Sequence, residues 1–216
     1  MHGKYGTESI MSNNFVITVG RQYGSGGREI AQRVAEILGI KSYGKELIRM
    51  AAERSGLHED TLATVDERAT SSLLYTLAMG SASYSGGNSG LGFNMPVNDK
   101  LFVVQSEIMK ELAEKESCVI IGRCGDYVLR DHPKKISVFI YADMDKRVER
   151  IMERHDLTAD AAKDIIAKTD KRRVNYYNFY TGRKWGKYEH YDISINSGLL
   201  GIERTAQMIA DIVKNY

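Results

Sequence analysis

Short apolar runs recur along the chain and alternate with longer segments that have helical spacing of apolar residues. Such runs are typical of buried parallel strands, and they predict strands at Phe15–Val19, Cys118–Ile121, Ile136–Tyr141 and Tyr191–Asn196. The longer segments predict helices at Arg28–Leu38, Lys45–Ser55, Phe102–Lys115, Asp143–His155, Thr158–Asn178 and Ile202–Val213. This alternation favours an α/β fold with a doubly wound parallel sheet.

Two segments depart from the alternation. Residues 1–14 contain no apolar core and predict a short disordered tail, so the expected domain spans residues 15–216. Residues 66–99 are rich in Ser, Gly and Asn and are too polar for a core. They predict a mobile insertion, partly helical near Leu73–Met79, with a plain disordered loop as the alternative.

Composition narrows the classes of protein that the chain can represent. Its 216 residues suit one large domain, and the net charge of +2 gives no support to general nucleic-acid binding. There is no apolar run of about 18 residues to predict a membrane span, and no apolar N-terminal segment to predict secretion. Cys118 and Cys124 fit a reduced cytosol, and neither the cysteines nor the histidines have the spacing of a metal site. We expect a cytoplasmic protein without a membrane partner.

The segment FVITVGRQYGSGGREI at 15–30 contains the clearest chemical signal. A strand, a glycine cluster and a helix in succession form the layout of a phosphate-binding loop. Glycines let backbone N–H groups approach phosphate oxygens without a blocking Cβ, and the helix N-terminus adds a positive dipole. A glycine-rich turn without a ligand is the alternative, but Ser25, Arg21 and Arg28 beside the glycines favour an anion.

The loop departs from the standard pattern G-x-x-x-x-G-K-[ST]. In one alignment Gly27 takes the place of the lysine, Arg28 that of the hydroxyl residue and Arg21 that of the first glycine. In the other, Arg28 replaces the lysine and Glu29 replaces the hydroxyl residue. Both alignments retain a cation and lack the lysine.

Further cations follow other predicted elements. Arg123 comes directly after the strand at Cys118–Ile121, where α/β folds bind ligands, and this position favours a phosphate contact over a surface turn. Lys45 follows a Ser-Tyr-Gly turn and could face an acceptor substrate, although an ordinary helix N-terminus explains it equally well.

A basic stretch interleaved with aromatic residues runs from Asp170 to Gly186 and includes Arg172, Arg173 and Arg183. In a phosphotransferase such a segment would be a lid whose arginines gather charge on the transferred group. A solvated helix face is the simpler interpretation. Binding of single-stranded nucleic acid is a third, and one short patch supports it only weakly.

Taken together, these segments resemble the cytidylate kinase-like proteins, relatives of the bacterial cytidylate kinases within the P-loop nucleoside monophosphate kinases. The resemblance extends from Phe15 to the C-terminus. It rests on the motifs GRQYGSGGREI, SYGKELIRMAAERSGL, CVIIGRCGDYVL, ISVFIYADMDKRVERIMER, DKRRVNYYNFYTGRKWG and YDISINSGLLGIERT.

The resemblance implies a P-loop fold of three α/β/α layers, with a lid at 170–186 and the insertion at 66–99 on the substrate side. It implies that Gly24, Ser25, Gly26, Gly27 and Arg28 hold the donor phosphates, and we assign Arg21 to the same site. Arg123 would contact the monophosphate, with Lys45 and Asp170 also on the substrate side. The residues expected to stabilise the transferred group are Arg28, Arg123, Arg172, Arg173 and Arg183.

The function that follows is transfer of the γ-phosphoryl group of ATP to a nucleoside monophosphate, first CMP or dCMP, or to a related small acceptor. Mg²⁺ would be held mainly by phosphate oxygens and waters, with no metal ligands assigned in the chain. A nucleotide-binding sensor or scaffold with little catalysis is the alternative, supported by the missing lysine. The acceptor and the oligomeric state stay open.

Overall fold

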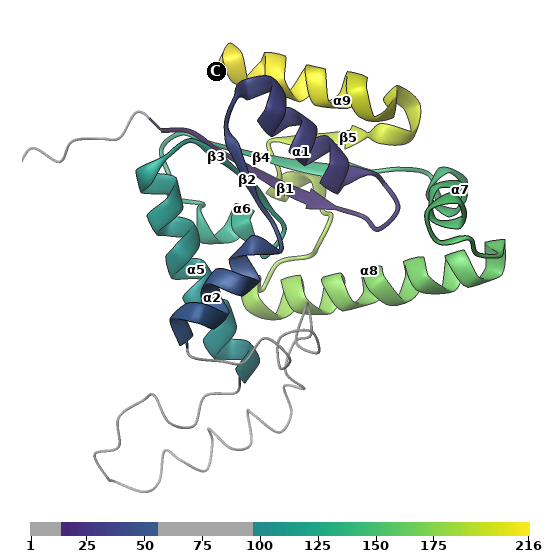
Figure 1. Cartoon of the computed structure of the whole chain (residues 1–216), viewed down its shortest axis with the longest axis horizontal. Helices are drawn as coiled ribbons and strands as arrows, with labels where there is room; N and C mark the ends of the chain where they lie inside the picture. The colour runs from purple at the N-terminus through teal and green to yellow at the C-terminus, as the bar shows by residue number, and fades with distance from the viewer. Residues whose placement is uncertain (1–13, 56–96) are drawn as a thin grey trace, which may run out of the picture.

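The computed structural model describes residues 14–55 and 97–216, drawn in colour in Figure 1. The predicted tail, apart from Asn14, and the predicted insertion, apart from residues 97–99, lie outside the described residues. Residues 97–99 belong to a helix and not to a loop, because helix α5 begins at Val97. Asp99 in its first turn interacts favourably with the positive end of the helix dipole.

Within the described residues, five parallel strands form the central sheet. They are β1 (Val16–Arg21), β2 (Lys41–Tyr43), β3 (Cys118–Ile121), β4 (Lys135–Tyr141) and β5 (Ile193–Asn196). Their order is β2-β3-β1-β4-β5, which places β1 at the centre. Val19 pairs with Ile121, so the loops that follow β1 and β3 lie next to each other. The predicted parallel α/β sheet is confirmed.

Helices cover both faces of the sheet and complete a three-layer fold (Figure 1). They are α1 (Gly27–Leu38), α2 (Glu46–Ser55), α5 (Val97–Lys115), α6 (Gly125–Val128), α7 (Met144–His155), α8 (Ala159–Thr181) and α9 (Ser197–Lys214), with the 3-10 turn η1 (Tyr188–His190) before β5. Helices α1 and α9 pack on one face, and α2, α5 and α6 pack on the other. A separate apolar cluster joins α7 to α8.

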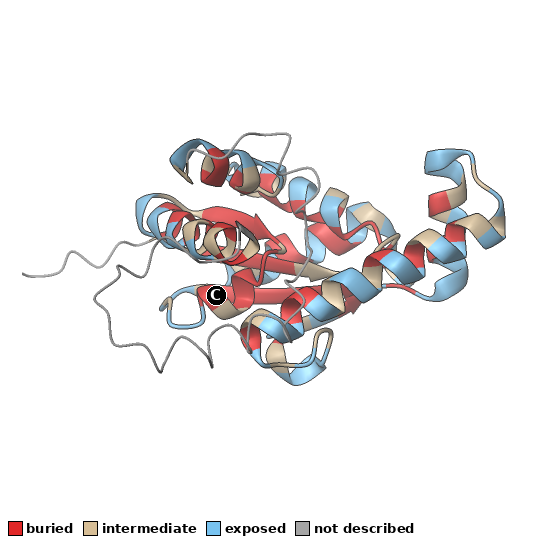
Figure 2. Cartoon of the chain, turned by 90° about the horizontal axis from the view of Figure 1, so that it is seen from below, coloured by how far each residue is buried: buried red, intermediate tan, exposed pale blue. Residues whose placement is uncertain are grey.

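Successive side chains of a central strand point to opposite faces of the sheet, and this explains why these strands appear in the sequence as continuous apolar runs. In β1, Val16 belongs to the core beneath α2 and α5, whereas Ile17 and Val19 belong to the core beneath α1 and α9. Both faces are therefore apolar, and the strands lie buried between helices with exposed outer sides (Figure 2). In residues 14–55 and 97–216, no helix is both long and apolar enough to cross a bilayer.

Three details differ from the sequence analysis. Strand β2 was not predicted, because this edge strand has only three residues, none of them buried. The four-residue helix α6 was also missed. Helix α8 continues to Thr181, three residues beyond the predicted end at Asn178, so residues 170–181 of the expected lid are helical. The helix ends at Gly182, whose φ of +67° favours glycine and whose N–H donates to the backbone oxygen of Asn178.

The chain leaves β3 through a turn of three successive left-handed residues. The φ angle is +78° at Gly122, +55° at Arg123 and +56° at Cys124. Such angles strain residues with side chains, so neighbouring contacts must hold the turn. One contact comes from the Tyr177 hydroxyl in α8, which donates to Oδ2 of Asp126 at 2.6 Å. Burial raises the pKa of Asp126, and this hydrogen bond opposes the rise.

We predict that Tyr177→Phe destabilises the protein by about 1–3 kcal/mol at pH 7, because a buried carboxylate loses its donor. The folded-state pKa of Asp126 is raised, so its contribution to stability falls as the pH rises from the unfolded-state pKa through the folded-state pKa. Without the tyrosine hydroxyl the folded-state pKa rises further. The variant should therefore lose more stability at pH 7 than at pH 4.

Thermal melts of Tyr177→Phe at both pH values measure this difference. Tyr188→Phe is the matched control, because Tyr188 is 72% exposed. An equal loss of stability at pH 4 and pH 7 would show that Tyr177 does not stabilise the Asp126 carboxylate.

Candidate active site

A cavity of about 540 Å³ opens at the carboxyl ends of β1 and β3. Its wall includes the loop after β1, the start of α2, the turn after β3, the end of α7 and one side of α8. Ligands of open α/β folds bind at this edge of the sheet. The sequence-predicted residues that line the cavity are Arg21, Gly24, Gly26, Gly27, Arg28, Lys45, Arg123, Arg172 and Arg173.

The glycine loop, residues 22–26, is fixed by hydrogen bonds to elements on either side. The side-chain oxygen of Gln22 accepts from the N–H of Ala142, which follows β4, at 3.2 Å. The hydroxyl of Ser197 in α9 donates to the backbone oxygen of Ser25 at 2.6 Å. The Ser25 hydroxyl donates to the backbone oxygen of Gln22 at 2.9 Å and accepts from the N–H of Gly27 at 3.3 Å. Ser25 thus shapes the loop from inside.

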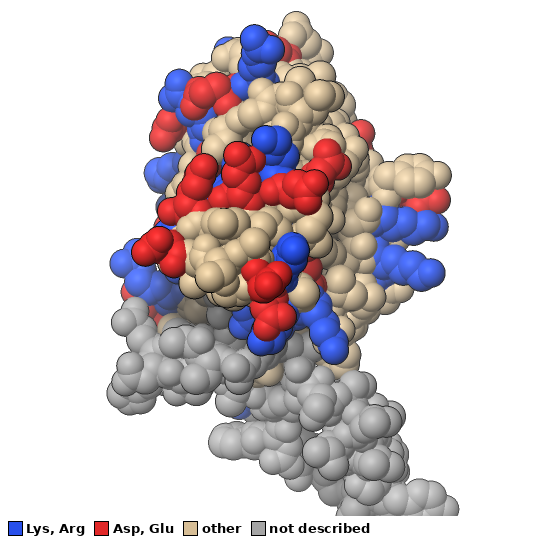
Figure 3. Space-filling view, turned by 90° about the vertical axis from the view of Figure 1, so that its right-hand side faces the viewer, with Lys and Arg blue, Asp and Glu red and all other residues tan. Residues whose placement is uncertain are grey.

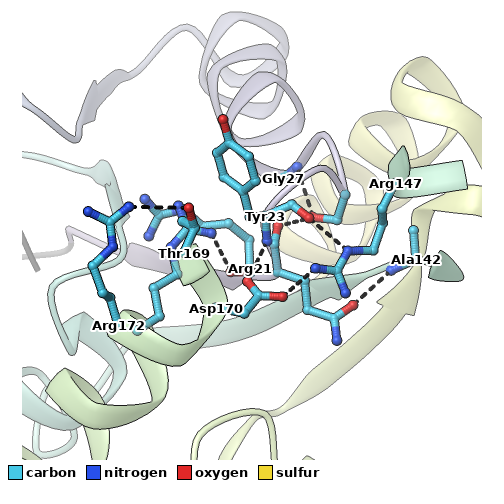
Figure 4. A network of polar contacts seen from close by, with 11 residues as sticks. Arg21, Tyr23, Gly27, Ala142, Arg147, Thr169, Asp170 and Arg172 are labelled. Atoms are coloured by element: carbon cyan, nitrogen blue, oxygen red, sulfur yellow. Dashed lines mark hydrogen bonds and ion pairs between the residues drawn. The ribbon is translucent and has the colours of Figure 1, made fainter. Parts of the chain in front are cut away.

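A buried ion pair joins the loop to α7 and α8 (Figure 4). Arg147 of α7 pairs with Oδ2 of Asp170 in α8, and its Nε donates to the backbone oxygen of Tyr23 at 2.7 Å. Oδ1 of Asp170 accepts from the N–H of Tyr23 at 2.8 Å. Arg147 is only 4% exposed, so these hydrogen bonds replace the water that both charges lose on folding.

Arg147, Arg150 and Arg154 are three or four residues apart in α7, so they form a row on one face of the helix, and this row lies along the loop. Next to Arg147 in this row comes Arg150, and a Cβ on Gly26 would collide with its guanidinium. Gly26 has a φ of +74° and supplies both the left-handed conformation and the space for this side chain. The third, Arg154, pairs with Glu29 in the first turn of α1. The row therefore contacts the loop and the start of α1.

Arg123 is held by the strained turn after β3 and lines the cavity. It is 7% exposed, and burial lowers the pKa of its guanidinium, while a hydrogen bond with Tyr176 in α8 counteracts this. A ligand of opposite charge stabilises such a buried cation. The planar fork of Arg123 suits two oxygens of one phosphate group.

Helix α8 presents two adjacent arginines in different states. Nη1 of Arg173 donates to the backbone oxygen of Arg21 at 3.1 Å, and its guanidinium lies 5.6 Å from the ring centre of Tyr23. Arg172 is exposed and donates to the hydroxyl of Thr169 at 3.2 Å. Arg173 is thus fixed against the loop, whereas Arg172 has freedom to meet a ligand.

The start of α2 forms the opposite wall. Lys45, directly before α2, and Arg28, in the first turn of α1, are exposed and line the cavity. The carboxylate of Glu46 accepts from the N–H of Gly44 at 2.8 Å and fixes the turn that contains Lys45. Backbone hydrogen bonds at Glu46 and Gly44 lower the pKa of this carboxyl group, and the positive charge of Arg28 adds to the effect.

Three sequence-predicted residues are not among those that line the cavity in the described chain. Ser25 is buried within the loop, and Asp170 has both carboxylate oxygens engaged by Tyr23 and Arg147. Arg183 lies beyond the end of α8, where its guanidinium is 5.1 Å from the ring centre of Tyr127.

The sequence analysis missed the contribution of α7. Besides the arginine row, His155 lines the cavity, and its Nε2 lies 3.2 Å from the Tyr23 hydroxyl. Arg147, Arg150 and Arg154 share one helix face directly after a strand, and this spacing was the available signal. Acidic residues on the same helix could pair with these arginines locally, and such pairing gave no reason to assign the arginines to the cavity.

Comparison with known proteins supports the resemblance seen in the sequence. The sequence model of the cytidylate kinase-like family matches residues 16–199. A cytidylate kinase from Archaeoglobus fulgidus is 28% identical over 202 residues, which cover 92% of this chain and 94% of that protein. An uncharacterized protein from Eubacterium ventriosum has a crystal structure that is 29% identical, with a TM-score of 0.69 over 94% of this chain and 100% of that chain.

A shikimate kinase from Bacteroides thetaiotaomicron indicates the shared fold alone. It is 15% identical, with a TM-score of 0.51 over 93% of this chain and 98% of that chain. Family assignment therefore rests on the sequence match, which spans most of the chain. The chain belongs to the cytidylate kinase-like family.

Proposed function

We propose that this protein transfers the γ-phosphoryl group of ATP to a nucleoside monophosphate, with CMP or dCMP as the acceptor. Membership of the cytidylate kinase-like family supports phosphoryl transfer of the nucleotide-kinase type. The observation that favours it most is the charge around the glycine loop. Among described residues, the cavity wall contains seven Lys and Arg side chains and one carboxylate, Glu29, which is already paired with Arg154.

This charge balance favours an acceptor that is itself phosphorylated. Like charges in one cavity repel each other, and anions that enter it are attracted and relieve the repulsion. A triphosphate donor and a monophosphate acceptor together supply several negative charges. A neutral alcohol as acceptor would bring no negative charge to Arg123 and Lys45.

The two substrates would bind at different walls of the cavity. The donor phosphates would lie on the glycine loop and the N-terminus of α1, near Arg28. The acceptor phosphate would lie between Arg123 and Lys45. Arg172 and Arg173 would neutralise charge between the two. Residues of this kind act by positioning and by charge stabilisation, and the transfer needs no covalent enzyme intermediate.

Mg²⁺ normally accompanies the donor in such transfers, where it neutralises phosphate charge. Among the described residues, no group of three or more His, Cys, Asp or Glu side chains is placed to hold a metal ion. Two carboxylates beside the loop, Glu29 and Asp170, are each paired with an arginine. The residues therefore fit an ion bound mainly by phosphate oxygens and waters.

The proposal is tested by ADP release from Mg–ATP in the presence of CMP, dCMP, UMP, AMP or small alcohols. We expect turnover with CMP or dCMP, and little with the alcohols. Tight Mg–ATP binding without turnover with any acceptor would instead favour a nucleotide-binding sensor or scaffold. Turnover with an alcohol alone would place the protein among small-molecule kinases of another kind.

The basic stretch from Asp170 to Gly186 also suggested nucleic-acid binding as an alternative function. On the face at the α7–α8 end, acidic and basic side chains are intermixed (Figure 3), and ion pairs include Lys146–Glu149, Lys163–Asp160 and Lys168–Asp164. A nucleic-acid backbone selects a surface of one sign. Salt-dependent binding of oligonucleotides without ATP turnover would nevertheless favour this class over a kinase.

We predict that Arg123→Lys raises KM for the acceptor or lowers kcat by about tenfold, with little change in ATP affinity. The substitution keeps the charge and loses the bidentate fork, and a charge-assisted contact contributes about 1.5–3 kcal/mol. Steady-state kinetics with each acceptor measure the effect, and Arg130→Lys at an exposed position is the control. Wild-type kinetics with every acceptor would remove Arg123 from the acceptor site.

The two arginines of α8 should respond differently to truncation. Arg173→Ala should lower both kcat and Tm, the latter by about 2–4 °C, because it also removes the hydrogen bond to the backbone of Arg21. Arg172→Ala should lower kcat and leave Tm unchanged, because the side chain is exposed. Lys171→Ala, the exposed neighbour, should change neither. A wild-type kcat in Arg172→Ala would exclude this residue from charge stabilisation.

A further inference from the structure

Gly27 stands where a standard phosphate-binding loop has its lysine, in the alignment that places Arg21 at the first glycine. The structure shows why a lysine does not fit there. A Cβ on Gly27 would lie 2.5 Å from Cβ and 3.1 Å from Cγ of Arg21, and 3.3 Å from Cβ of Ile140. These atoms are the bases of side chains on the central strands, so rotating a flexible end cannot relieve the collision.

The Arg21 side chain extends from this position to the carboxyl end of β3. A Cβ on Gly122 would collide with Nη1 of Arg21 and would lie 3.0 Å from its Cζ. Gly27 and Gly122 therefore border the two ends of one arginine side chain. Arg21 also lines the cavity, and its backbone is fixed by the hydrogen bond from Arg173. Figure 4 shows Arg21 among the residues that surround the loop.

Arg28 is the other candidate for the missing cation. It is exposed at the second position of α1, and its charge lowers the pKa of Glu46 at the start of α2. The exposed Arg28 side chain therefore lies on the α2 side of the loop. The base of the Arg21 side chain, in contrast, lies against the glycine that has taken the position of the lysine, and its guanidinium lies beside Gly122.

We propose that Arg21 supplies the cation of this loop from the first-glycine position, so that cation and glycine have exchanged places relative to the standard pattern. The proposal rests on the function proposed above, in which the loop holds the donor phosphates of ATP. The guanidinium would contact phosphate oxygens through its two-pronged fork. Because Cβ atoms at positions 21 and 27 exclude each other, the loop accommodates a cation at one position only when the other is glycine.

The test exchanges the two residues in the full-length chain. Arg21→Gly, Gly27→Lys and two double variants, Arg21→Gly/Gly27→Lys and Arg21→Ala/Gly27→Lys, are compared with the wild type. The readouts are Mg–ATP affinity by titration calorimetry and melting temperature. Arg204→Ala is the control for loss of one positive charge, because Arg204 is exposed on α9 and is not among the residues that line the cavity.

Each variant has a distinct expected result. Arg21→Gly should weaken Mg–ATP binding by about 10- to 100-fold, the effect of losing one charge-assisted phosphate contact. Gly27→Lys should lower the melting temperature, because its Cβ collides with that of Arg21. Arg21→Gly/Gly27→Lys should regain affinity relative to Arg21→Gly and should melt higher than Gly27→Lys. Arg21→Ala/Gly27→Lys should regain neither, because alanine keeps the Cβ that collides.

A wild-type melting temperature for Gly27→Lys, or equal recovery in the two double variants, overturns the exchange. Failure of the proposed function has a different signature. The wild type would then release no ADP with any nucleoside monophosphate, while the differences in Mg–ATP affinity and melting persist. Conversely, if the wild type turns over and Arg21→Gly/Gly27→Lys shows no recovery, the proposed kinase function stands and the proposed exchange is wrong.

Discussion

The buried contact among Arg147, Asp170 and Tyr23 determines how the cavity is assembled. A buried ion pair gains little net stability, because the desolvation of both charges offsets their attraction. Here each group also hydrogen-bonds the backbone of the loop, so the pair fixes the geometry of the loop in addition to the stability that it contributes. It fixes α7 and α8 relative to the loop after β1. The remaining cations of both helices then face the loop because the helices cannot rotate without breaking the pair.

A cavity lined with so many cations would be unstable if each relied on a ligand for a partner. The structure instead gives several of the cations partners within the chain. Arg154 pairs with Glu29, Arg173 donates to the backbone oxygen of Arg21, and Tyr176 hydrogen-bonds Arg123. Most of these partners are neutral, so the positive charge is held in place without being cancelled. Preorganised cations of this kind stabilise developing phosphate charge without further reorganisation.

The sequence predicted those features that depend on local pattern, and missed those that depend on distant contacts. The buried strands and the position of Arg123 at the end of β3 were predicted because apolar runs and strand ends are visible in a short window. Strand β2 was missed because its three residues are not buried. Asp170 was expected at the substrate, yet its partners are Arg147 and Tyr23, the latter 147 positions away in the chain. Periodicity gives no information about such a pairing, since the fold alone brings these residues together.

The missing lysine is a further case in which the sequence pattern does not reveal a contact between distant residues. In the sequence, Gly27 looks like the loss of a catalytic group and favours a protein that binds nucleotides without turnover. In three dimensions, Gly27 and Gly122 are the space that the Arg21 side chain requires. A glycine is informative here through the neighbour that it admits. The charge of a phosphate-binding loop should therefore be judged from all positions that can reach the same point, because a cation can enter from the strand as well as from the helix.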